Sequence, residues 1–399
     1  MYDLIILGAG ASGLMAAIQA AGRGRRVLVL DHAKEAGKKL LVSGGGKCNV
    51  TNRQITVSDY FGMNSAFCSD ALKRFTAGTA LDLLRNADIQ TEERDYGRVF
   101  CKKNASAIVF YLVHTAENSG VRFVFNTTVS EVSYTTCFRV KCELGTSHVQ
   151  QERKGEQLYE GSHLLVATGG LARPQLGATN LGYVVARQFR HKISPLRPAL
   201  TGFLLPQDSP LMNLQGISLD VRLQINGKGF VVEEPLLFTH KGISGPSVFQ
   251  VSCFWEKGDV VTVNFLPSGD LISQMHDPSN GKWIVKSLIA RFLPERLVRA
   301  VIPDHLPDRK VAGLSKKDRE TIAECIHSYA VRPEGTEGFS KAEATLGGVS
   351  TDQINPATME SLLQKGLFFT GEVIDITGKL GGYNIHWAFA SGYVAGQSV

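Results

Sequence analysis

Three glycines near the N-terminus, Gly8, Gly10 and Gly13, have the spacing that allows a polypeptide to bind a pyrophosphate. In such a pattern the first glycine permits a sharp turn, the second lets the backbone approach the phosphates without a Cβ, and the third lets a helix pack closely on a strand. Asp31 follows at the end of the next apolar run, where a carboxylate can accept hydrogen bonds from ribose hydroxyls. These four residues predict a site for the ADP half of a dinucleotide, whereas a ligand-free glycine turn would leave Asp31 without a role.

The segments around these residues have the patterns of the elements that must position them. Residues 2–7 are mostly apolar and predict a strand, residues 11–23 have helical spacing of apolar side chains, and residues 26–30 predict a second strand. The helix would direct its free N–H groups and the positive end of its dipole at the phosphates. The order strand, glycine turn, helix, strand is the usual support for a bound dinucleotide.

Further glycine-rich segments favour FAD over a nicotinamide dinucleotide. An apolar strand at 163–166 runs into a second glycine turn at 167–170, and residues 370–375 place carboxylates beside another strand end. A helix beginning at Gly382 would direct N–H donors at the negative charge that a reduced flavin develops near N1 and O2. Each of these glycines could also be an ordinary turn or cap residue. Combined with the N-terminal unit, they predict FAD that is held from both ends of the chain.

The sequence contains no second dinucleotide-binding unit. Residues 177–182 contain glycines at the wrong spacing, and Cys48 has Arg53 where the partner of a redox cysteine pair would stand. The pattern therefore excludes a flavin disulfide reductase. If NAD(P)H is the electron donor, we expect it to bind transiently and to compete with the substrate.

The pattern of apolar residues changes along the chain and predicts an interrupted α/β domain. Residues 196–267 alternate as antiparallel strands do, whereas residues 282–330 have helical spacing. The expected domains are an FAD-binding domain at 1–192 and 343–399, an inserted β domain at 193–267 and 331–342, and an inserted helical domain at 268–330.

The same patterns predict smaller elements. The segment 37–52 is basic and glycine-rich, and we expect it to be a loop whose backbone amides face a ligand. Ser315 and Asp318 form a capping signature for a helix that runs to about residue 329. Further helices are expected at 65–75, 79–86, 105–118 and 180–189, and further strands at 121–126, 129–134 and 366–370.

The composition is that of an ordinary globular protein. The chain has 399 residues, a formal net charge of +6 and 43% hydrophobic residues, and no stretch reaches the roughly 20 apolar residues that a membrane helix needs. Seven scattered cysteines without a C-x-x-C pair argue against a disulfide framework and against a metal site. The N-terminus lacks a basic leader, so we expect a cytoplasmic protein. The mild positive charge does not distinguish an acidic substrate from RNA.

Three residues are candidates for catalytic roles beside the cofactor. Cys48 lies in the glycine-rich segment, either as a thiol near the flavin or as a small residue that fills space. His240 lies in a loop rich in Thr, Lys and Gly, where it could be a general acid or a structural residue. His386 follows Gly382 by about one helical turn. It could protonate a substrate or pack between helix and sheet.

Several ordered segments resemble a bacterial family of FAD-dependent oxidoreductases described as aminoacetone-oxidase-like or bile-acid-reductase-like. The resemblance covers essentially the whole chain and rests on residues 43–52, 167–171, 237–246, 335–338, 342–349, 370–375 and 381–384. It implies an α/β fold in which a Rossmann-like, two-dinucleotide-binding FAD domain is interrupted by a β-barrel-like domain and a small helical domain.

The motifs and the resemblance together predict which residues contact FAD. They are Gly8, Gly10, Ala11, Ser12, Gly13, Asp31, His32, Lys39, Ser43, Gly45, Gly46, Asn49, Thr51, Val129, Thr168, Gly169, Gly371, Glu372, Asp375, Gly381, Gly382, Tyr383 and Asn384.

The leading hypothesis is an FAD-dependent oxidoreductase that acts on a small organic substrate, by ene-reduction or by amine or alcohol oxidation. A tRNA-modifying flavoprotein and a non-catalytic flavin-binding sensor are the alternatives. Acidic residues within 282–330 dilute the positive charge there, so we expect no nucleic-acid partner. The lack of a long apolar stretch predicts that the protein does not enter a membrane. The substrate, the electron donor and the oligomeric state stay open.

Overall fold

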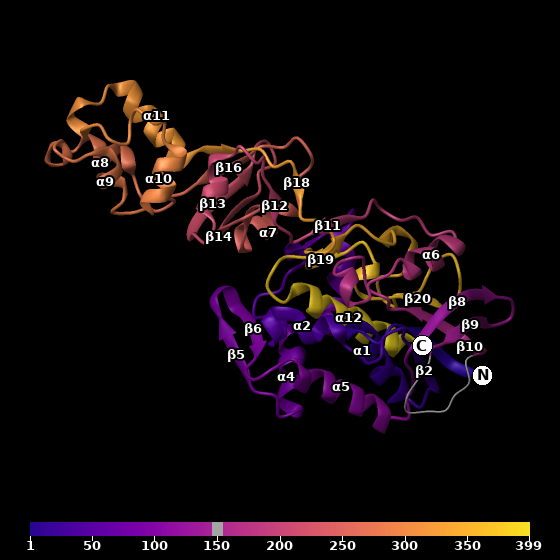
Figure 1. The fold of residues 1–399 in the computed structure, drawn as a ribbon. Helices are drawn as coiled ribbons and strands as arrows, with labels where there is room; N and C mark the ends of the chain where they lie inside the picture. Colours follow the sequence, from indigo (N-terminus) through magenta and orange to yellow (C-terminus); the bar gives the residue numbers. More distant parts are fainter. Residues whose placement is uncertain (146–154) are drawn as a thin grey trace. The chain divides into compact units, whose positions relative to one another are not determined.

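The structure is a computed structural model that describes residues 1–145 and 155–399. The chain forms two compact units (Figure 1). Unit 1 comprises Met1–Arg197 and Ala344–Val399, and unit 2 comprises Pro198–Glu343. The division of the inserted region into a β domain and a helical domain stays a prediction.

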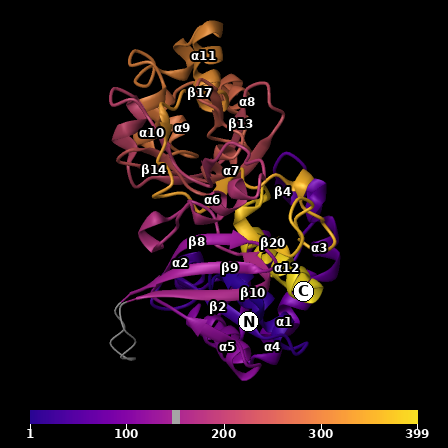
Figure 2. The ribbon, with the colours of Figure 1, turned by 90° about the vertical axis from the view of Figure 1, so that its right-hand side faces the viewer.

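Unit 1 is built on a seven-stranded sheet. In order across the sheet the strands are β7 (Arg122–Val124), β2 (Val27–Leu30), β1 (Tyr2–Leu7), β10 (Glu156–Val166), β9 (Phe138–Leu144) and β8 (Thr127–Tyr134), with β20 (Leu367–Phe369) paired to β10. The pairs β7–β2, β2–β1, β1–β10 and β10–β20 are parallel, whereas β9 and β8 extend the sheet in antiparallel fashion (Figure 2). Four residues of β1 are buried in succession, as expected for a central strand covered on both faces. These pairings confirm the predicted α/β fold.

Seven α-helices and two small sheets complete the regular structure in the described part of unit 1. The helices are α1 (Ala11–Ala21), α2 (Lys38–Gly46), α3 (Ser69–Arg74), α4 (Ala77–Asn86), α5 (Ser106–Asn118), α6 (Leu181–Gln188) and α12 (Tyr383–Ser398). The small sheets are β3 (Asn49–Asn52) with β6 (Arg98–Cys101) and β5 (Thr91–Arg94), and β4 (Tyr60–Phe61) with β21 (Thr377–Gly378). The strands β11 (Arg197–Ala199) and β19 (Ala344–Leu346) lie where the chain passes from one unit to the other.

The helix α12 packs closely along α1, the helix of the first glycine turn (Figure 1). Gly392 and Gly396 make this approach possible, because a Cβ at these positions would lie 2.3 Å from the Ser12 carbonyl oxygen and 2.5 Å from that of Ala16. Arg23, just after α1, donates to the backbone carbonyl of Gln397 at 2.6 Å. The end of the chain is thus part of the support for the N-terminal turn.

The prediction that 37–52 is entirely a loop is wrong. Residues from Lys38 form a helical turn, which Gly37 precedes in the left-handed region with a φ of 73°. Leu40 is buried and anchors this turn in the core. Ser43 then leaves the helical region, and β3 follows within the same segment. Tertiary burial of one leucine has overcome the low helix propensity of a glycine-rich stretch.

Unit 2 contains an antiparallel sheet of seven strands. Their order is β17 (Tyr329–Val331), β16 (Val261–Asn264), β13 (Ser218–Ile225), β14 (Val231–Thr239), β15 (Gly242–Ser244), β12 (Phe203–Leu204) and β18 (Gly335–Thr336). The helices are α7 (Pro246–Ser252), α8 (Leu271–His276), α9 (Val285–Ile289), α10 (Glu295–Val301) and α11 (Lys316–His327). The predicted capping box of Ser315 and Asp318 starts α11. The antiparallel prediction is confirmed, and closure of this sheet into a barrel stays a prediction.

None of the helices in the described ranges combines the length and the apolar character that crossing a bilayer requires.

Candidate functional site

The turn between β1 and α1 is a tight backbone cradle. A Cβ on Gly8, whose φ is 108°, would lie 2.5 Å from the Ala167 carbonyl oxygen, and a Cβ on Gly13 would lie 2.0 Å from that of Gly8. By contrast, a Cβ on Gly10 would meet no protein atom within 4 Å. Gly8 and Gly13 therefore serve close packing, and Gly10 borders open space. Ala11 begins α1 behind the turn, beside Ser12.

The carboxylate of Asp31 ties this turn to the end of β2. One of its oxygens accepts a hydrogen bond from the Ala9 amide at 2.7 Å, and the other accepts one from the Ala33 amide at 2.7 Å. Each oxygen still has a lone pair with which it could accept a ribose hydroxyl. His32 points its Nδ1 toward Asp31 at 3.5 Å. Asp31 thus shapes the turn in addition to its predicted contact with the cofactor.

The second glycine turn lies beside the first, because β10 pairs in parallel with β1. A Cβ on Gly169 would meet no protein atom within 4 Å, so this glycine also borders open space. The hydroxyl of Thr168 is buried and lies over Gly182, where a Cβ would be only 2.2 Å from it. The contact of Gly169 with the cofactor stays a prediction, and the side chain of Thr168 packs against α6.

A polar network that the motifs did not indicate links this turn to β19 and α2. Thr345 accepts hydrogen bonds through its hydroxyl from the amides of Leu171 at 2.8 Å and Ala172 at 3.1 Å. Its own amide donates to Glu372 at 2.9 Å, and Glu372 in turn pairs with Lys39 at 2.5 Å. Thr345 stands within the segment that carries the family resemblance, but nothing in its spacing reveals these long-range partners.

The start of α12 forms the other end of the candidate site. A Cβ on Gly382 would lie 2.4 Å from the Thr51 carbonyl oxygen, so β3 and α12 meet at backbone contact. The Asn49 side chain is within 3.0 Å of the Gly382 amide. The side chain of Asn384 accepts a hydrogen bond from the Gly378 amide at 2.8 Å and donates one to the Gly378 carbonyl at 2.9 Å. These two hydrogen bonds hold the loop that precedes the helix.

Other predicted contact residues lie around this helix with protein partners of their own. Asp375 accepts a hydrogen bond from the Ser194 hydroxyl at 2.7 Å, and the Tyr383 hydroxyl donates to the Gln54 carbonyl at 3.2 Å. Gly371 lies against α1, where a Cβ would be 2.7 Å from the Ser12 hydroxyl. These residues hold the segments of unit 1 together around the site.

The remaining predicted contacts are spread along α2, β8 and the α12 loop. Ser43 donates to the Leu40 carbonyl at 2.7 Å, whereas a Cβ on Gly45 would meet open space. The Gly46 carbonyl accepts a hydrogen bond from the Ala105 amide at 2.8 Å. The Gly381 carbonyl accepts one from the side-chain amide of Asn52 at 3.1 Å. Val129 is half-buried on β8, whose first residue donates its amide to the Asp31 carbonyl.

His386 is completely buried on α12. Its Nδ1 is hydrogen-bonded to the Thr51 hydroxyl at 2.9 Å, and its Nε2 lies 3.0 Å from the Phe75 carbonyl oxygen. Burial lowers the pKa of His386 to about 4, so the ring is neutral near neutral pH. Both ring nitrogens are engaged, which favours the structural interpretation of His386 over the catalytic one.

Cys48 is buried, and burial raises the pKa of its thiol to about 12. Since only the thiolate attacks electrophiles, a raised pKa keeps this thiol unreactive. We expect iodoacetamide at neutral pH to leave Cys48 unmodified in the native protein and to modify it after denaturation. Peptide mass spectrometry would measure this, with half-buried Cys137 as the internal comparison. Rapid alkylation of native Cys48 would support a role as an exposed thiol instead.

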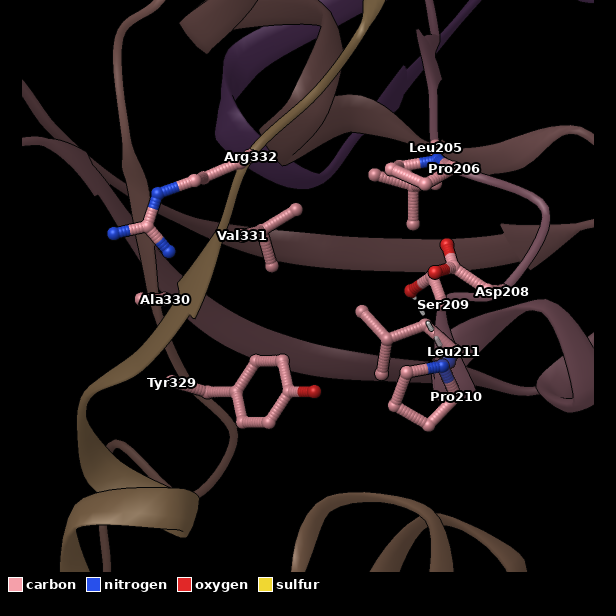
Figure 3. Close-up of a pocket in the computed structure, with 10 residues that line it drawn as sticks. All are labelled: Leu205, Pro206, Asp208, Ser209, Pro210, Leu211, Tyr329, Ala330, Val331 and Arg332. Atoms are coloured by element: carbon pink, nitrogen blue, oxygen red, sulfur yellow. Dashed lines mark hydrogen bonds between the residues drawn. The ribbon is translucent and has the colours of Figure 1, made fainter.

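His240 is exposed in the turn between β14 and β15 of unit 2, so unit 1 does not include it. Unit 2 also has a shallow pocket of about 270 Å³. Its lining includes Ser209, Tyr329 and Arg332 but none of the predicted site residues (Figure 3). The pocket therefore does not belong to the predicted cofactor site.

The residues of unit 1 fit a bound dinucleotide. Gly10, Gly45 and Gly169 all border space in which a Cβ would meet nothing within 4 Å. Gly10 precedes α1, Gly45 lies in α2 and Gly169 lies in the second glycine turn, so three segments of unit 1 have backbone that a ligand could approach. Within residues 1–145 and 155–399 no cluster of potential metal ligands exists.

Comparison with known proteins gives full-length matches. A family model described as the HI0933-like protein Rossmann domain matches residues 2–398. The ribosomal RNA dihydrouridine synthase of Escherichia coli (strain K12) is 38% identical over 404 residues, which cover 100% of this chain and 98% of that protein. The 3-dehydro-bile acid delta(4,6)-reductase of Clostridium scindens is 30% identical over 417 residues, which cover 100% of this chain and 99% of that protein. A solved flavocytochrome c3 fumarate reductase in its open conformation is a distant likeness of fold, with 16% identity, a TM-score of 0.47 and coverage of 100% of this chain and 78% of that chain.

The family match and the match to the bile-acid reductase support the resemblance to a family of flavoprotein oxidoreductases. They do not support the description as aminoacetone-oxidase-like, which stays an expectation.

Proposed function

We propose, from the premise that this chain belongs to the family of HI0933-like proteins with a Rossmann domain, that it reduces a carbon–carbon double bond of uridine in ribosomal RNA. The chain is an FAD-dependent oxidoreductase. The observation that carries the proposed substrate is the 38% identity, along the whole chain, to a ribosomal RNA dihydrouridine synthase. The proposal departs from the expectation that the protein has no nucleic-acid partner.

The residues of unit 1 suit the two ends of FAD. The backbone at Gly10 and the carboxylate of Asp31 would hold the pyrophosphate and ribose, and the start of α12 would receive the flavin ring. Bound FAD supplies the hydride that reduction of a double bond requires. With NAD(P)H as the reductant, uridine gains a hydride and a proton and NAD(P)H is oxidised to NAD(P)⁺.

An exposed aromatic side chain stands near the start of α12. Tyr96, at the tip between β5 and β6, is 57% exposed and has a φ of 62°, which is uncommon for a tyrosine. The side-chain amide of Asn52 donates both to the Tyr96 carbonyl at 3.0 Å and to the Gly381 carbonyl at 3.1 Å, so one side chain holds the two segments together. The guanidinium of Arg98 lies 5.0 Å from the centre of the Tyr96 ring. A ring held in this way offers a stacking surface for a base beside the flavin end.

Tyr96→Ala is expected to raise KM for RNA by about five- to a hundredfold, because stacking of one base contributes about 1–3 kcal/mol. FAD content should stay unchanged, and Tyr96→Phe should behave as the wild type. Phe110→Ala removes a ring that is 66% exposed on α5 and is the matched control. An unchanged KM for Tyr96→Ala would exclude Tyr96 from substrate binding.

A direct assay tests the function. FAD-loaded protein is incubated without oxygen with NADH or NADPH and with deproteinised ribosomal RNA from cells that lack this protein, and the RNA is digested to nucleosides. We expect dihydrouridine in the mass spectrum only when the reductant and the protein are both present. Absence of dihydrouridine from a protein whose flavin NAD(P)H does reduce would refute the proposal.

A second candidate function is reduction of a small conjugated ketone, favoured by the 30% identity to a bile-acid reductase over the whole chain. The same assay with a 3-dehydro-bile acid in place of RNA separates the two. Turnover of the bile acid alone would favour this candidate, which is closer to the small organic substrate expected from the sequence.

A further inference from the structure

Two exposed aromatic rings lie around one guanidinium in unit 2. Trp283 is 40% exposed and Phe292 is 44% exposed. The guanidinium carbon of Arg291, which is also exposed, lies 5.7 Å from the centre of each ring. Trp283, Arg291 and Phe292 are called the aromatic patch below.

The local fold presents this patch on a fixed backbone. The short helix α9 buries Val285, Leu288 and Ile289 in the core of unit 2, which leaves the residues on either side of the helix at the surface. The Trp283 carbonyl accepts a hydrogen bond from the Val311 amide at 2.9 Å, and the Phe292 amide donates to the Ile289 carbonyl at 2.9 Å. The backbone of the residues that carry the rings is therefore already fixed, and little conformational freedom is lost when a ligand binds the rings.

Basic residues outnumber acidic ones in the segment that carries the aromatic patch. Residues 282–310 contain seven Lys or Arg residues and three Asp or Glu residues. Lys286 and Arg299 both pair with Asp308. Lys310 lies beside the patch, because its backbone forms a bridge with that of Ile284.

Three cations at or next to the patch have no ion pair within the described ranges of the chain, namely Lys282, Arg291 and Lys310. Their charge is therefore available to an anionic ligand. Exposed aromatic rings together with free cations are the combination with which proteins bind single-stranded nucleic acid, since bases stack on the rings and phosphates contact the cations.

We propose that the aromatic patch and its neighbours Lys282 and Lys310 bind a single-stranded segment of the RNA substrate, an inference that rests on the proposed function. One base stacks on Trp283 or Phe292, and the guanidinium of Arg291 contacts a phosphate. An acidic protein partner would use the cations but would gain less from two separate rings, so RNA fits the combination better.

The test measures the affinity of FAD-loaded protein for a labelled single-stranded RNA oligonucleotide by fluorescence anisotropy. Replacing both rings, Trp283→Ala with Phe292→Ala, is expected to weaken binding about tenfold or more, because each stacked base contributes substantially to affinity. Trp283→Phe with Phe292→Tyr keeps two rings and should bind as the wild type does. Ile272→Ala removes an apolar side chain that is 44% exposed in the same unit and is the matched control.

Salt dependence tests the charged part of the patch separately. Arg291→Ala and Lys310→Ala should each reduce the slope of log K against log salt by about 0.7, the value for one phosphate contact on a single strand. Lys316→Ala removes a cation that is 88% exposed on α11, away from the patch in sequence, and should leave the slope unchanged. Circular dichroism and FAD content show that each variant is folded.

The outcomes distinguish this inference from the proposed function. If the wild type forms dihydrouridine in ribosomal RNA but the double alanine variant binds the oligonucleotide as tightly as the wild type, the inference is wrong and the function stands. If the wild type binds no RNA, the inference is overturned. If the wild type binds RNA through the patch but forms no dihydrouridine, the patch is supported and the proposed reaction fails.

Discussion

Gly13→Ala is expected to destabilise unit 1 by about 3 kcal/mol, the upper part of the usual range for overpacking. The new methyl would lie 2.0 Å from the Gly8 carbonyl oxygen and 3.3 Å from the Ala167 Cβ, so backbone on β1 or α1 must move. Urea denaturation followed by circular dichroism would measure the loss, and FAD should be lost with the fold. Wild-type stability of this variant would show that the turn is looser than described.

Gly10→Ala is the matched variant in the same turn. Its backbone φ of −81° suits alanine, and the added methyl meets no protein atom within 4 Å, so the free energy of unfolding should hardly change. If the pyrophosphate passes over Gly10, the methyl occupies its place and FAD content falls sharply. A Gly10→Ala protein that is both stable and fully loaded with FAD would refute this position for the pyrophosphate.

Asp31→Ala is expected to lower FAD affinity about ten- to a hundredfold, since hydrogen bonds to a charged group contribute about 1.5–3 kcal/mol. It should also destabilise the apoprotein, because the amides of Ala9 and Ala33 each lose an acceptor at 2.7 Å. Equilibrium dialysis measures the first effect and urea denaturation of the apoprotein measures the second.

Asp31→Asn separates these two roles. The asparagine retains one carbonyl acceptor for a backbone amide but removes the negative charge, so apoprotein stability should recover more than FAD affinity does. If Asp31→Ala lowers stability but leaves FAD affinity unchanged, the carboxylate only shapes the turn and does not contact the ribose.

The sequence was sufficient to predict the elements in both units whose local pattern and tertiary role agree. β1, α1 and β2 follow directly from apolar spacing and three glycines, and the capping box of Ser315 appears as expected. The segment around Lys38 was mispredicted because the burial of Leu40, a long-range contact, decides its conformation. Local propensity cannot report a contact with a distant segment.

The same limit applies to the candidate site. Glu372 and Asp375 were predicted as ligands of the cofactor from their position after a strand, and no local signal reveals that Thr345 and Ser194 donate hydrogen bonds to them. His386 shows the limit most plainly, because its partners Thr51 and Phe75 lie more than three hundred residues earlier in the chain. Spacing identifies residue types suited to chemistry, whereas the fold decides which of them face open space.

The packing of α12 along α1 also bears on the order in which the protein is made. A ribosome releases α1 and the first glycine turn long before residues 383–398 exist, so the groove that Gly392 and Gly396 fill stays uncovered throughout translation. Unit 2, which is encoded between the two parts of unit 1, leaves the ribosome before unit 1 can close. If the start of α12 holds the flavin as predicted, we expect a nascent chain to complete its cofactor site only after residues 383–398 have been made.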